Sequence, residues 1–169
     1  MNGDGKPDLL VANVCGGSGN CANPGQQPGS VGVLLGNGDG TFQPAAAYGS
    51  GGNGTSSVVV ADVNGDGKLD LLATNLCASS SNCATPGLHP GSVGVLLGNG
   101  DGTFQPAVTY GSGGRYAESV AVGDVNADGQ PDLLVANYCV NGPCTSGAVG
   151  VLLHSSSPSS TFECRTGDQ

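Results

Sequence analysis

The chain has 169 residues and a formal net charge of −9, and it contains only four Lys and Arg residues. So few cations in an acidic chain argue against nucleic acid as a partner. Its 32 Gly and 10 Pro residues favour tight turns between short strands and leave little room for helices. No apolar run approaches the roughly 20 residues of a transmembrane helix, so we expect an all-β protein without a membrane span.

One acidic loop recurs three times in the sequence, at a spacing of 62 residues. The first copy lacks its first acid, and the other two copies are complete. Eight of the eleven Asp residues belong to these loops, so most of the acidity is concentrated there. The copies read Asn2-Gly-Asp4-Gly-Lys6-Pro-Asp8, Asp62-Val-Asn64-Gly-Asp66-Gly-Lys68-Leu-Asp70 and Asp124-Val-Asn126-Ala-Asp128-Gly-Gln130-Pro-Asp132.

The oxygen atoms in this loop suit calcium, which takes about six to eight oxygen ligands. Side chains at positions 1, 3 and 5 converge on one point, Gly at position 6 lets the chain reverse, position 7 offers a carbonyl and position 9 a carboxylate. Plain Asn/Asp-Gly turns of similar composition are the alternative. We predict one site on Asp62, Asn64, Asp66, the Lys68 carbonyl and Asp70, a second on Asp124, Asn126, Asp128, the Gln130 carbonyl and Asp132, and a partial third on Asn2, Asp4, Lys6 and Asp8.

An EF-hand begins with the same residues but is a different structure. It needs a bidentate Glu at position 12 and a helix on each side of the loop. Position 12 is Ala73 or Val135 here, and the residues that follow the second loop, Leu71–Asn75, are strand-like. The same run argues against a dockerin, whose loop leads into a helix.

The residues between two loops predict four short strands per repeat. In the second unit these are Leu71–Asn75, Val93–Leu97, Phe104–Tyr110 and Ser119–Gly123, with a break at Gly111–Gly114. Four short strands with Gly-rich turns are typical of an antiparallel blade. Because several runs are apolar at consecutive positions, we expect both faces of each sheet to be covered, as when blades stack.

The predicted fold is therefore all-β, with tandem four-stranded antiparallel blades of β-propeller type. The chain would hold about 2.5–3 repeats of 62 residues in an open array. We divide it into repeat 1 (1–62), repeat 2 (63–124) and a partial repeat 3 with a degenerate tail (125–169).

A second turn, Asn37-Gly-Asp39-Gly and Asn99-Gly-Asp101-Gly, also recurs. A calcium loop in this register would have Leu at position 1 and Gln at position 9, and neither side chain suits the ion's carboxylate preference. Asn-Gly and Asp-Gly are favoured hairpin turns, so we interpret these segments as hairpins.

Six of the seven cysteines form three close pairs that follow the repeat. The pairs are separated by five, five and four residues, whereas zinc pairs usually have two to four intervening residues and further ligands nearby; His89 and His154 do not follow the pairs. Three local disulfides, and with them an oxidising compartment, are the better interpretation. Cys164 is either free or cross-links chains. The pairs are Cys15 with Cys21, Cys77 with Cys83, and Cys139 with Cys144.

Two recurring segments resemble the FG-GAP/VCBS-type repeat of bacterial secreted proteins. They are Asp-Val-Asn-Gly-Asp-Gly-Lys-x-Asp-Leu from Asp62 and Gly-Val-Leu-Leu-Gly-Asn-Gly-Asp-Gly-Thr-Phe from Gly94. Such repeats are similar to the calcium-binding blades of integrin α-subunit propellers. The resemblance extends to about residue 153 and implies four-stranded blades, calcium at the blade edge, and roles in adhesion, surface structure or ligand binding.

The chain departs from that family pattern in three respects. The paired cysteines are an addition to the common repeat. Propellers have about four to eight blades, so fewer than three complete units cannot close a ring alone. In the third unit His154-Ser-Ser-Ser-Pro-Ser-Ser160 replaces the Asn-Gly-Asp-Gly turn.

We expect an extracellular or cell-surface calcium-binding module with a structural or adhesive role. Its expected partners are further copies of the same chain, other extracellular proteins or glycans. No Ser/His/Asp set or pair of catalytic carboxylates is evident, so we do not expect an enzyme. The alternatives are a carbohydrate-binding propeller module and a fragment of a larger secreted propeller. Met1 is not followed by a signal-peptide pattern, which favours a mature product or a fragment.

Two features suggest self-association. Pro28–Ala45 recurs unchanged at Pro90–Ala107, so successive units present similar surfaces, and self-similar ends associate head to tail into a ring or a filament. Thr166-Gly-Asp168-Gln169 resembles the residues that lead into the third loop. We hypothesise that Asp168 of one molecule completes the partial site of the next, the alternative being a disordered tail and a truncated first loop.

Overall fold

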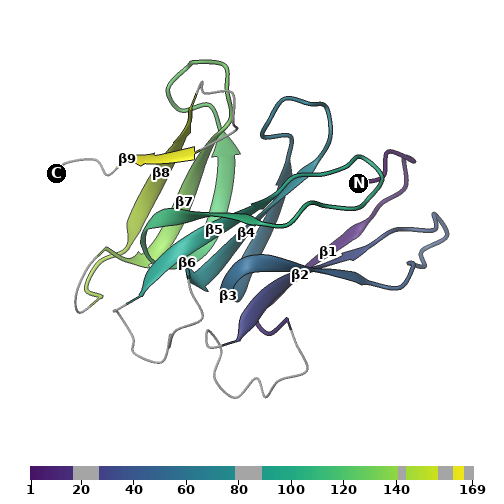
Figure 1. Cartoon of the computed structure of the whole chain (residues 1–169), viewed down its shortest axis with the longest axis horizontal. Coiled ribbons are helices and arrows are strands. Elements are labelled where there is room, and N and C mark those ends of the chain that lie inside the picture. Colours follow the sequence, from purple (N-terminus) through teal and green to yellow (C-terminus); the bar gives the residue numbers. More distant parts are fainter. Residues whose placement is uncertain (17–26, 79–88, 141–143, 156–161, 166–169) are drawn as a thin grey trace.

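The computed structural model describes residues 1–16, 27–78, 89–140, 144–155 and 162–165. Within them the chain forms nine antiparallel strands in chain order, each paired with the next, in one open sheet (Figure 1). These described residues contain no helix that could cross a membrane. The predicted all-β, open architecture is confirmed. The strands are β1 (Leu9–Asn13), β2 (Pro28–Leu34), β3 (Ala46–Ala61), β4 (Asp70–Cys77), β5 (Pro90–Leu96), β6 (Val108–Gly123), β7 (Asp132–Cys139), β8 (Ala148–His154) and β9 (Phe162–Arg165).

Two long strands, β3 and β6, each pair with different neighbours at their two ends. The first part of β6 pairs with β5, and its second part pairs with β7. The predicted break at Gly111–Gly114 is wrong, because β6 continues through it. Gly113 has φ +76°, a conformation that glycine adopts without strain, so the strand can bend where a break was expected. The predicted third and fourth strands of a repeat are therefore one bent strand.

The predicted third strand also begins too early. Phe104 forms only an isolated bridge with Gly98, and β6 starts at Val108. Between them lies Pro106, which has no N–H to donate to a strand ladder. A separate backbone bond from Gln105 to the Leu97 carbonyl (2.8 Å) holds this segment beside β5.

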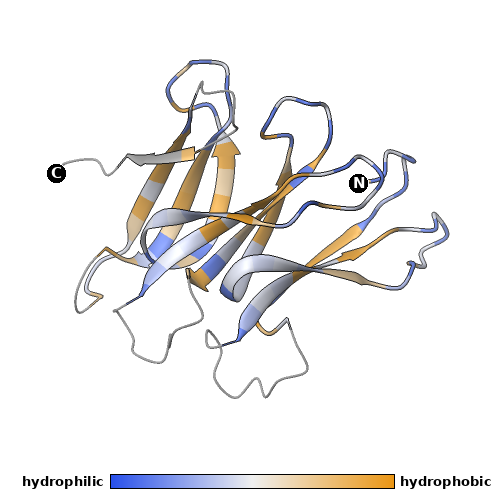
Figure 2. Ribbon diagram, viewed as in Figure 1, coloured by the Kyte–Doolittle hydropathy of each residue, from blue (hydrophilic) through white to orange (hydrophobic). Residues whose placement is uncertain are grey.

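The bends in β3 and β6 fold the sheet into three stacked layers. The first holds β1, β2 and the start of β3, the second the rest of β3 with β4, β5 and the start of β6, and the third the rest of β6 with β7–β9. Apolar residues concentrate along the strands that face one another (Figure 2). One core joins Val31 and Val33 of β2 to Leu71 and Ala73 of β4. A second joins the middle and third layers through Leu72, Val93, Val95, Leu133, Val135 and Leu152.

The layers approach so closely that glycine is required between them. A Cβ on Gly94 would lie 1.9 Å from the Ser50 carbonyl oxygen, and one on Gly150 would lie 1.8 Å from that of Ser112. Both faces of β4 and β5 are buried almost throughout. The prediction from consecutive apolar residues is confirmed for the run in β5, whereas the run Val58–Ala61 at the end of β3 is half-buried.

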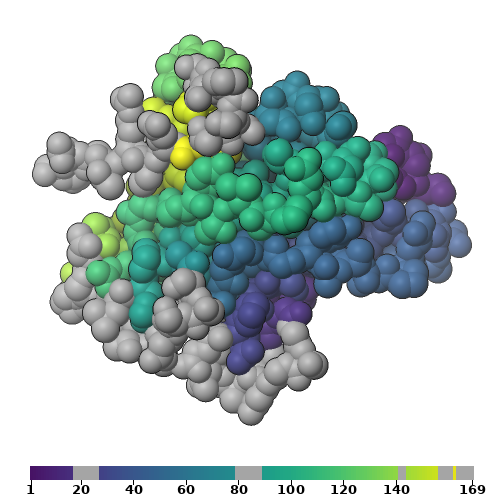
Figure 3. Space-filling view, viewed as in Figure 1, coloured from purple at the N-terminus to yellow at the C-terminus, as the bar shows by residue number. Residues whose placement is uncertain are grey.

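The two outer faces of the stack remain open. Leu9 and Val11 in β1 are 43% and 39% exposed, whereas Leu71 and Ala73, at the same repeat positions in β4, are fully buried. At the opposite end Val149 is 67% exposed. Figure 3 shows the first layer at the end of the molecule, beyond the second layer.

Candidate metal centre

The acidic loops lie at strand junctions on one edge of the stack. The second loop connects β3 to β4, the third connects β6 to β7, and the first precedes β1. Because β3 ends directly before Asp62 and β4 begins at Asp70, the antiparallel pair Ala61↔Asp70 brings the two ends of the loop together.

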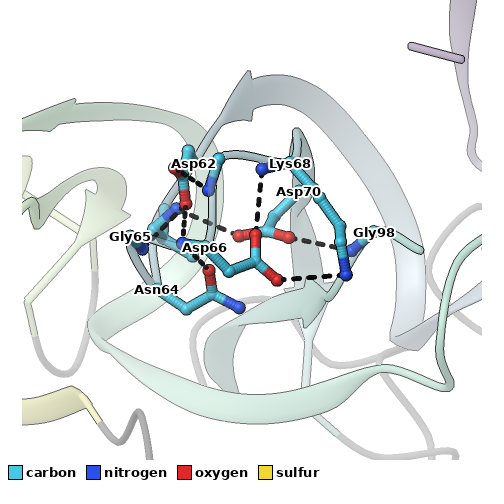
Figure 4. A network of polar contacts seen from close by, with 9 residues as sticks. Asp62, Asn64, Gly65, Asp66, Lys68, Asp70 and Gly98 are labelled. Atoms are coloured by element: carbon cyan, nitrogen blue, oxygen red, sulfur yellow. Dashed lines mark hydrogen bonds and ion pairs between the residues drawn. The ribbon is translucent and has the colours of Figure 1, made fainter. Parts of the chain in front are cut away.

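Backbone N–H groups of the second loop point at the carboxylate of Asp62 (Figure 4). Its Oδ1 accepts hydrogen bonds from the N–H groups of Gly65 (2.8 Å) and Asp66 (3.2 Å), and its Oδ2 accepts one from Gly67 (2.8 Å). Positive φ at Gly65 and Gly67 allows this tight reversal. The position-1 carboxylate is thus held inside the loop by backbone donors.

The side chains at positions 3 and 5 are fixed in the same way. Asn64 Oδ1 accepts the N–H of Asp66 (2.9 Å), and Asp66 Oδ1 accepts the N–H of Lys68 (2.9 Å). The Lys68 ammonium lies 3.6 Å from the second oxygen of Asp66. Positions 1, 3 and 5 therefore come from one short, ordered turn.

The third loop repeats this geometry. Asp124 accepts the N–H groups of Asp128 (3.2 Å) and Gly129 (2.9 Å), Asn126 Oδ1 accepts that of Asp128 (3.0 Å), and Asp128 Oδ1 accepts that of Gln130 (2.8 Å). Ala127 takes φ +61°, where the second loop has a glycine. A left-handed conformation is costly for alanine. The loop nevertheless keeps the same backbone shape with alanine at this position.

The first loop keeps the bonds of positions 3 and 5. Asn2 Oδ1 accepts the N–H of Asp4 (3.3 Å), and Asp4 Oδ1 accepts that of Lys6 (2.9 Å). The nitrogen of Met1 contacts Asp8, in the position where the N–H of Val63 contacts Asp70. The loop thus has the same form over the residues that it shares with the other two.

The acids at position 9 are buried and fasten each loop to the next hairpin. Asp70 Oδ2 accepts the N–H of Val63 (3.0 Å), and its Oδ1 accepts that of Gly98 (2.8 Å). Asp132 does the same with the N–H groups of Val125 (3.0 Å) and His154 (2.9 Å). Sequence reasoning predicted these acids as ligands but missed this anchoring role.

Burial and neighbouring charge act on the pKa of Asp70. Loss of solvent around the carboxylate raises its pKa, the Gly98 and Val63 N–H groups lower it, and the negative charges of Asp66 and Asp62 raise it; the net direction is upward. The charges of Asp62 and Asp66 thus add to burial in disfavouring the ionised form of Asp70, an effect that a nearby cation would offset.

The position-5 acids show the opposite shift. Hydrogen bonds from the Lys6, Lys68 and Gln130 backbone N–H groups are the main reason that the pKa values of Asp4, Asp66 and Asp128 are lowered. These acids are exposed, so their carboxylates stay ionised and reachable from solvent.

The residues of the loops fit a hard divalent cation. The atoms that the loops offer to an ion are carboxylate, amide and carbonyl oxygens, and the Lys68 ammonium lies beside Asp66. Among the described parts of the chain, no three His, Cys, Asp or Glu side chains form a cluster that could hold a metal ion. The flexible geometry of calcium tolerates such a set of carboxylates, amide and carbonyl oxygens.

The Asn-Gly-Asp-Gly segments are hairpin turns that pack against the loops. Asp101 Oδ1 accepts the Thr103 N–H (2.9 Å) and hydroxyl (2.6 Å), so its bonds are satisfied within the turn. A Cβ on Gly100 would lie 3.2 Å from the Lys68 side chain, and one on Gly38 would lie 3.3 Å from that of Lys6. The position-7 lysine thus lies across the neighbouring turn, a contact that sequence spacing did not reveal.

Sequence reasoning also missed a buried polar cluster between the layers. Asn75 Oδ1 accepts the hydroxyls of Ser50 (2.6 Å) and Thr55 (3.1 Å), and Asn75 Nδ2 donates to the Ser50 carbonyl (3.2 Å). Asn137 forms the same pair of bonds with Ser112. The available signal was the 62-residue spacing of Asn13, Asn75 and Asn137.

One of the predicted disulfides can be followed in full. Cys139 and Cys144 are bonded to each other, and Cys15 and Cys77 are also in disulfides. Cys21, Cys83 and Asp168 lie outside the described residues, as does the side chain of Cys164. The predictions for these four residues stay predictions.

The fold defines a class of protein. It is an all-β repeat array in which each layer has an Asp-rich loop. The model of the FG-GAP-like repeat family matches residues 1–73 and 83–135. The chain therefore belongs to the FG-GAP-like repeat family. A comparison with curated proteins gives no match.

Proposed function

We propose that the protein is an extracellular calcium-binding structural or adhesive module, whose layers are blades of propeller type. The observation that carries this proposal is that backbone N–H groups hold the side chains at positions 1 and 3 in the same way in the second and third loops, at Asp62 and Asn64 and at Asp124 and Asn126. Family membership supports the same conclusion.

The residues that would hold the ion are those at positions 1, 3, 5, 7 and 9. Calcium would supply positive charge that neutralises the mutual repulsion of the loop carboxylates. Asp70 would link the loop to the backbone of the next hairpin, through Gly98. The loop joins two paired strands. We therefore expect a bound calcium ion to stabilise the layer that contains these strands.

Isothermal titration calorimetry with calcium tests this proposal. The chain should bind at least two ions, and Asp62→Asn should remove one because it deletes the charge at position 1. Asp101→Asn is the matched control: it lies in a hairpin turn with similar composition and should leave the stoichiometry unchanged. Equal loss in both variants, or no binding by the parent chain, contradicts the proposal.

Secretion and a non-enzymatic role belong to the same proposal. The disulfide between Cys139 and Cys144 supports an oxidising compartment. The carbohydrate-binding alternative has less support, because the recurring tyrosines are used in packing: Tyr48 and Tyr110 lie edge-on against Phe104 and Phe162 at 5.4 and 5.5 Å. They are not free platforms for a sugar ring.

Head-to-tail self-association is the assembly that we propose for the module. The open faces at the two ends, with Leu9 and Val11 on one and Val149 on the other, correspond to the two sides of the interface between layers. Exposed apolar patches of this kind mark contact surfaces. Sedimentation velocity should show concentration-dependent assemblies in calcium, and a monomer at all concentrations would contradict the assembly.

A further inference from the structure

Asparagine followed by glycine occurs in three settings within the described residues. These are the hairpin turns, with Asn37-Gly38 and Asn99-Gly100, the acidic loops, with Asn64-Gly65 in the second, and β3, with Asn53-Gly54. The dipeptide is chemically labile, because glycine has no Cβ that would keep its nitrogen away from the preceding side chain. The surroundings of each copy decide whether it can react.

The reaction is deamidation. The backbone nitrogen of the glycine attacks Cγ of the asparagine and gives up its proton, and the side-chain nitrogen takes up a proton and leaves as ammonia. The new C–N bond closes a succinimide ring, which water opens at either carbonyl to give aspartate or isoaspartate. No reactant besides water is needed, but the glycine N–H must be free to approach Cγ.

In the second acidic loop the attacking nitrogen is held. The Gly65 N–H donates to Asp62 Oδ1 (2.8 Å). The side chain under attack is held as well, because Asn64 Oδ1 accepts the N–H of Asp66 (2.9 Å). Both partners of the reaction must therefore break a hydrogen bond before they can meet.

The copy in β3 is protected in another way. Asn53 is only 2% exposed, so water has little access to its side chain. The Gly54 N–H donates to the Gln27 carbonyl (3.2 Å). This nitrogen is therefore held by the backbone of the neighbouring segment.

The hairpin turns lack such protection. Asn37 and Asn99 are exposed, as are the glycines that follow them. Within the described parts of the chain, no acceptor receives the N–H of Gly38 or Gly100. The two glycines have similar φ values of +84° and +87°, so we expect the two turns to react alike.

Loss of the amide changes the bonding within the turn. Asn99 Nδ2 donates to Thr103 Oγ1 (2.8 Å), and the Thr103 hydroxyl donates to Asp101 Oδ1 (2.6 Å). A hydroxyl has one proton to donate, so Thr103 can only accept from the side chain of residue 99. An aspartate there has no proton to give and would place a second carboxylate against the same hydroxyl.

The turn is connected to the core through the residue that follows it. Phe104 is buried and packs edge-on against Tyr48 at 5.4 Å. The Asn99 N–H also donates to the Thr103 carbonyl (3.0 Å), directly before this phenylalanine. A changed turn should therefore affect how Phe104 is held.

We propose that Asn99 and Asn37 are sites of spontaneous deamidation in the folded protein, and that Asp62 protects Asn64 from the same reaction. The proposal goes beyond the calcium function and does not depend on it, because the bond from Gly65 to Asp62 forms within the chain itself.

The rates are measured by mass spectrometry of peptic fragments, after the oxidised chain has been kept in EGTA at neutral pH. Asn99 and Asn37 should lose their amides about tenfold faster than Asn64, which is the factor that one net hydrogen bond is worth. In urea, where the fold is lost, the three sites should react at similar rates. An intact amide at Asn99, or equal rates at Asn99 and Asn64 in the folded chain, overturns the proposal.

Two variants at one position test the protection. Asp62→Ala removes the acceptor of the Gly65 N–H, so Asn64 should react about tenfold faster, while Asn99 is the internal reference and should keep its rate. Asp62→Asn is the matched control, because it keeps an acceptor oxygen and should leave Asn64 protected. An unchanged rate at Asn64 in Asp62→Ala, or the same acceleration in both variants, overturns the role of Asp62.

Asn99→Asp reproduces one product and tests its effect on the turn. The equilibrium constant for unfolding in urea should rise about fivefold, because the carboxylate cannot donate to Thr103. In a Thr103→Val background the same substitution should have a smaller effect, since the hydroxyl for which the two carboxylates compete is gone. Equal effects in the two backgrounds overturn the proposed consequence of deamidation.

Discussion

Asn75 shows how a single polar residue can specify the packing between two layers. It is fully buried and bonds to Ser50 and Thr55, which lie on the bent part of β3. A buried amide costs free energy unless its donors and acceptors are satisfied. Here the two hydroxyls donate to Oδ1, and Nδ2 donates to the Ser50 and Ala73 carbonyls. The cluster therefore helps to fix where β3 bends.

Replacing Asn75 by Ala should destabilise the protein by about 3 kcal/mol, because the Ser50 hydroxyl would lose its buried acceptor and the Ser50 carbonyl the N–H that it accepts. Asn13→Ala is the matched control. It removes the same residue type at the same repeat position, but Asn13 is only partly buried and bonds to Ser30 at 3.3 Å, so we expect a cost below about 1 kcal/mol. Urea unfolding measures both, and equal costs would contradict this role for Asn75.

At the residue scale the sequence was a good guide to the loops and a poor guide to their surroundings. The alternating acids and the glycine at position 6 predicted a tight turn, and the bonds that form it, from the Asp66 N–H to Asn64 and from the Lys68 N–H to Asp66, are local. The convergence of the side chains on an ion stays a prediction. The bonds of Asp70 to Gly98 and of Asn75 to Ser50 join residues 28 and 25 positions apart. Such contacts depend on how strands pack, which local spacing does not encode.

Strands and turns carry the next level of organisation, in which β3 and β6 each serve two layers. Consecutive apolar residues correctly predicted that β5 is buried on both faces, whereas the similar run at the end of β3 is half-buried. Gly111–Gly114 was read as a break, since glycine often ends a strand; the tertiary structure instead uses it as a bend, because β5 and β7 hold the two halves of β6. The pairing of β6 with β5 and β7 therefore makes this segment a bend in one strand and not a break between two strands.

The glycine at the crossing of layers gives a test at this scale. Gly94→Ala should destabilise the protein by about 3 kcal/mol, since its Cβ would meet a backbone oxygen that cannot easily move. Gly32 occupies the same position in the first layer, where the nearest atom would be 3.5 Å away. Gly32→Ala should therefore be nearly neutral in thermal unfolding, and a similar loss in both variants would contradict the layered packing.

The whole molecule is an open stack held by two apolar cores and fastened at one edge by acidic loops. The repeat length and the family resemblance predicted the open all-β array. The division into repeats 1–62, 63–124 and 125–169 stays a prediction. The predicted partners, which are a second copy of the chain, other extracellular proteins or glycans, stay predictions.

Calcium-dependent stability tests the central claim most directly. Binding to the folded state alone stabilises by RT ln(1 + [Ca]/Kd), which is about 1.4 kcal/mol per site at 1 mM calcium and a Kd near 10⁻⁴ M. Urea unfolding of the oxidised chain should therefore show about 3 kcal/mol more stability in 1 mM calcium than in EGTA, and Asp62→Asn should remove about half of this difference. Superimposable unfolding curves in calcium and EGTA would contradict the account.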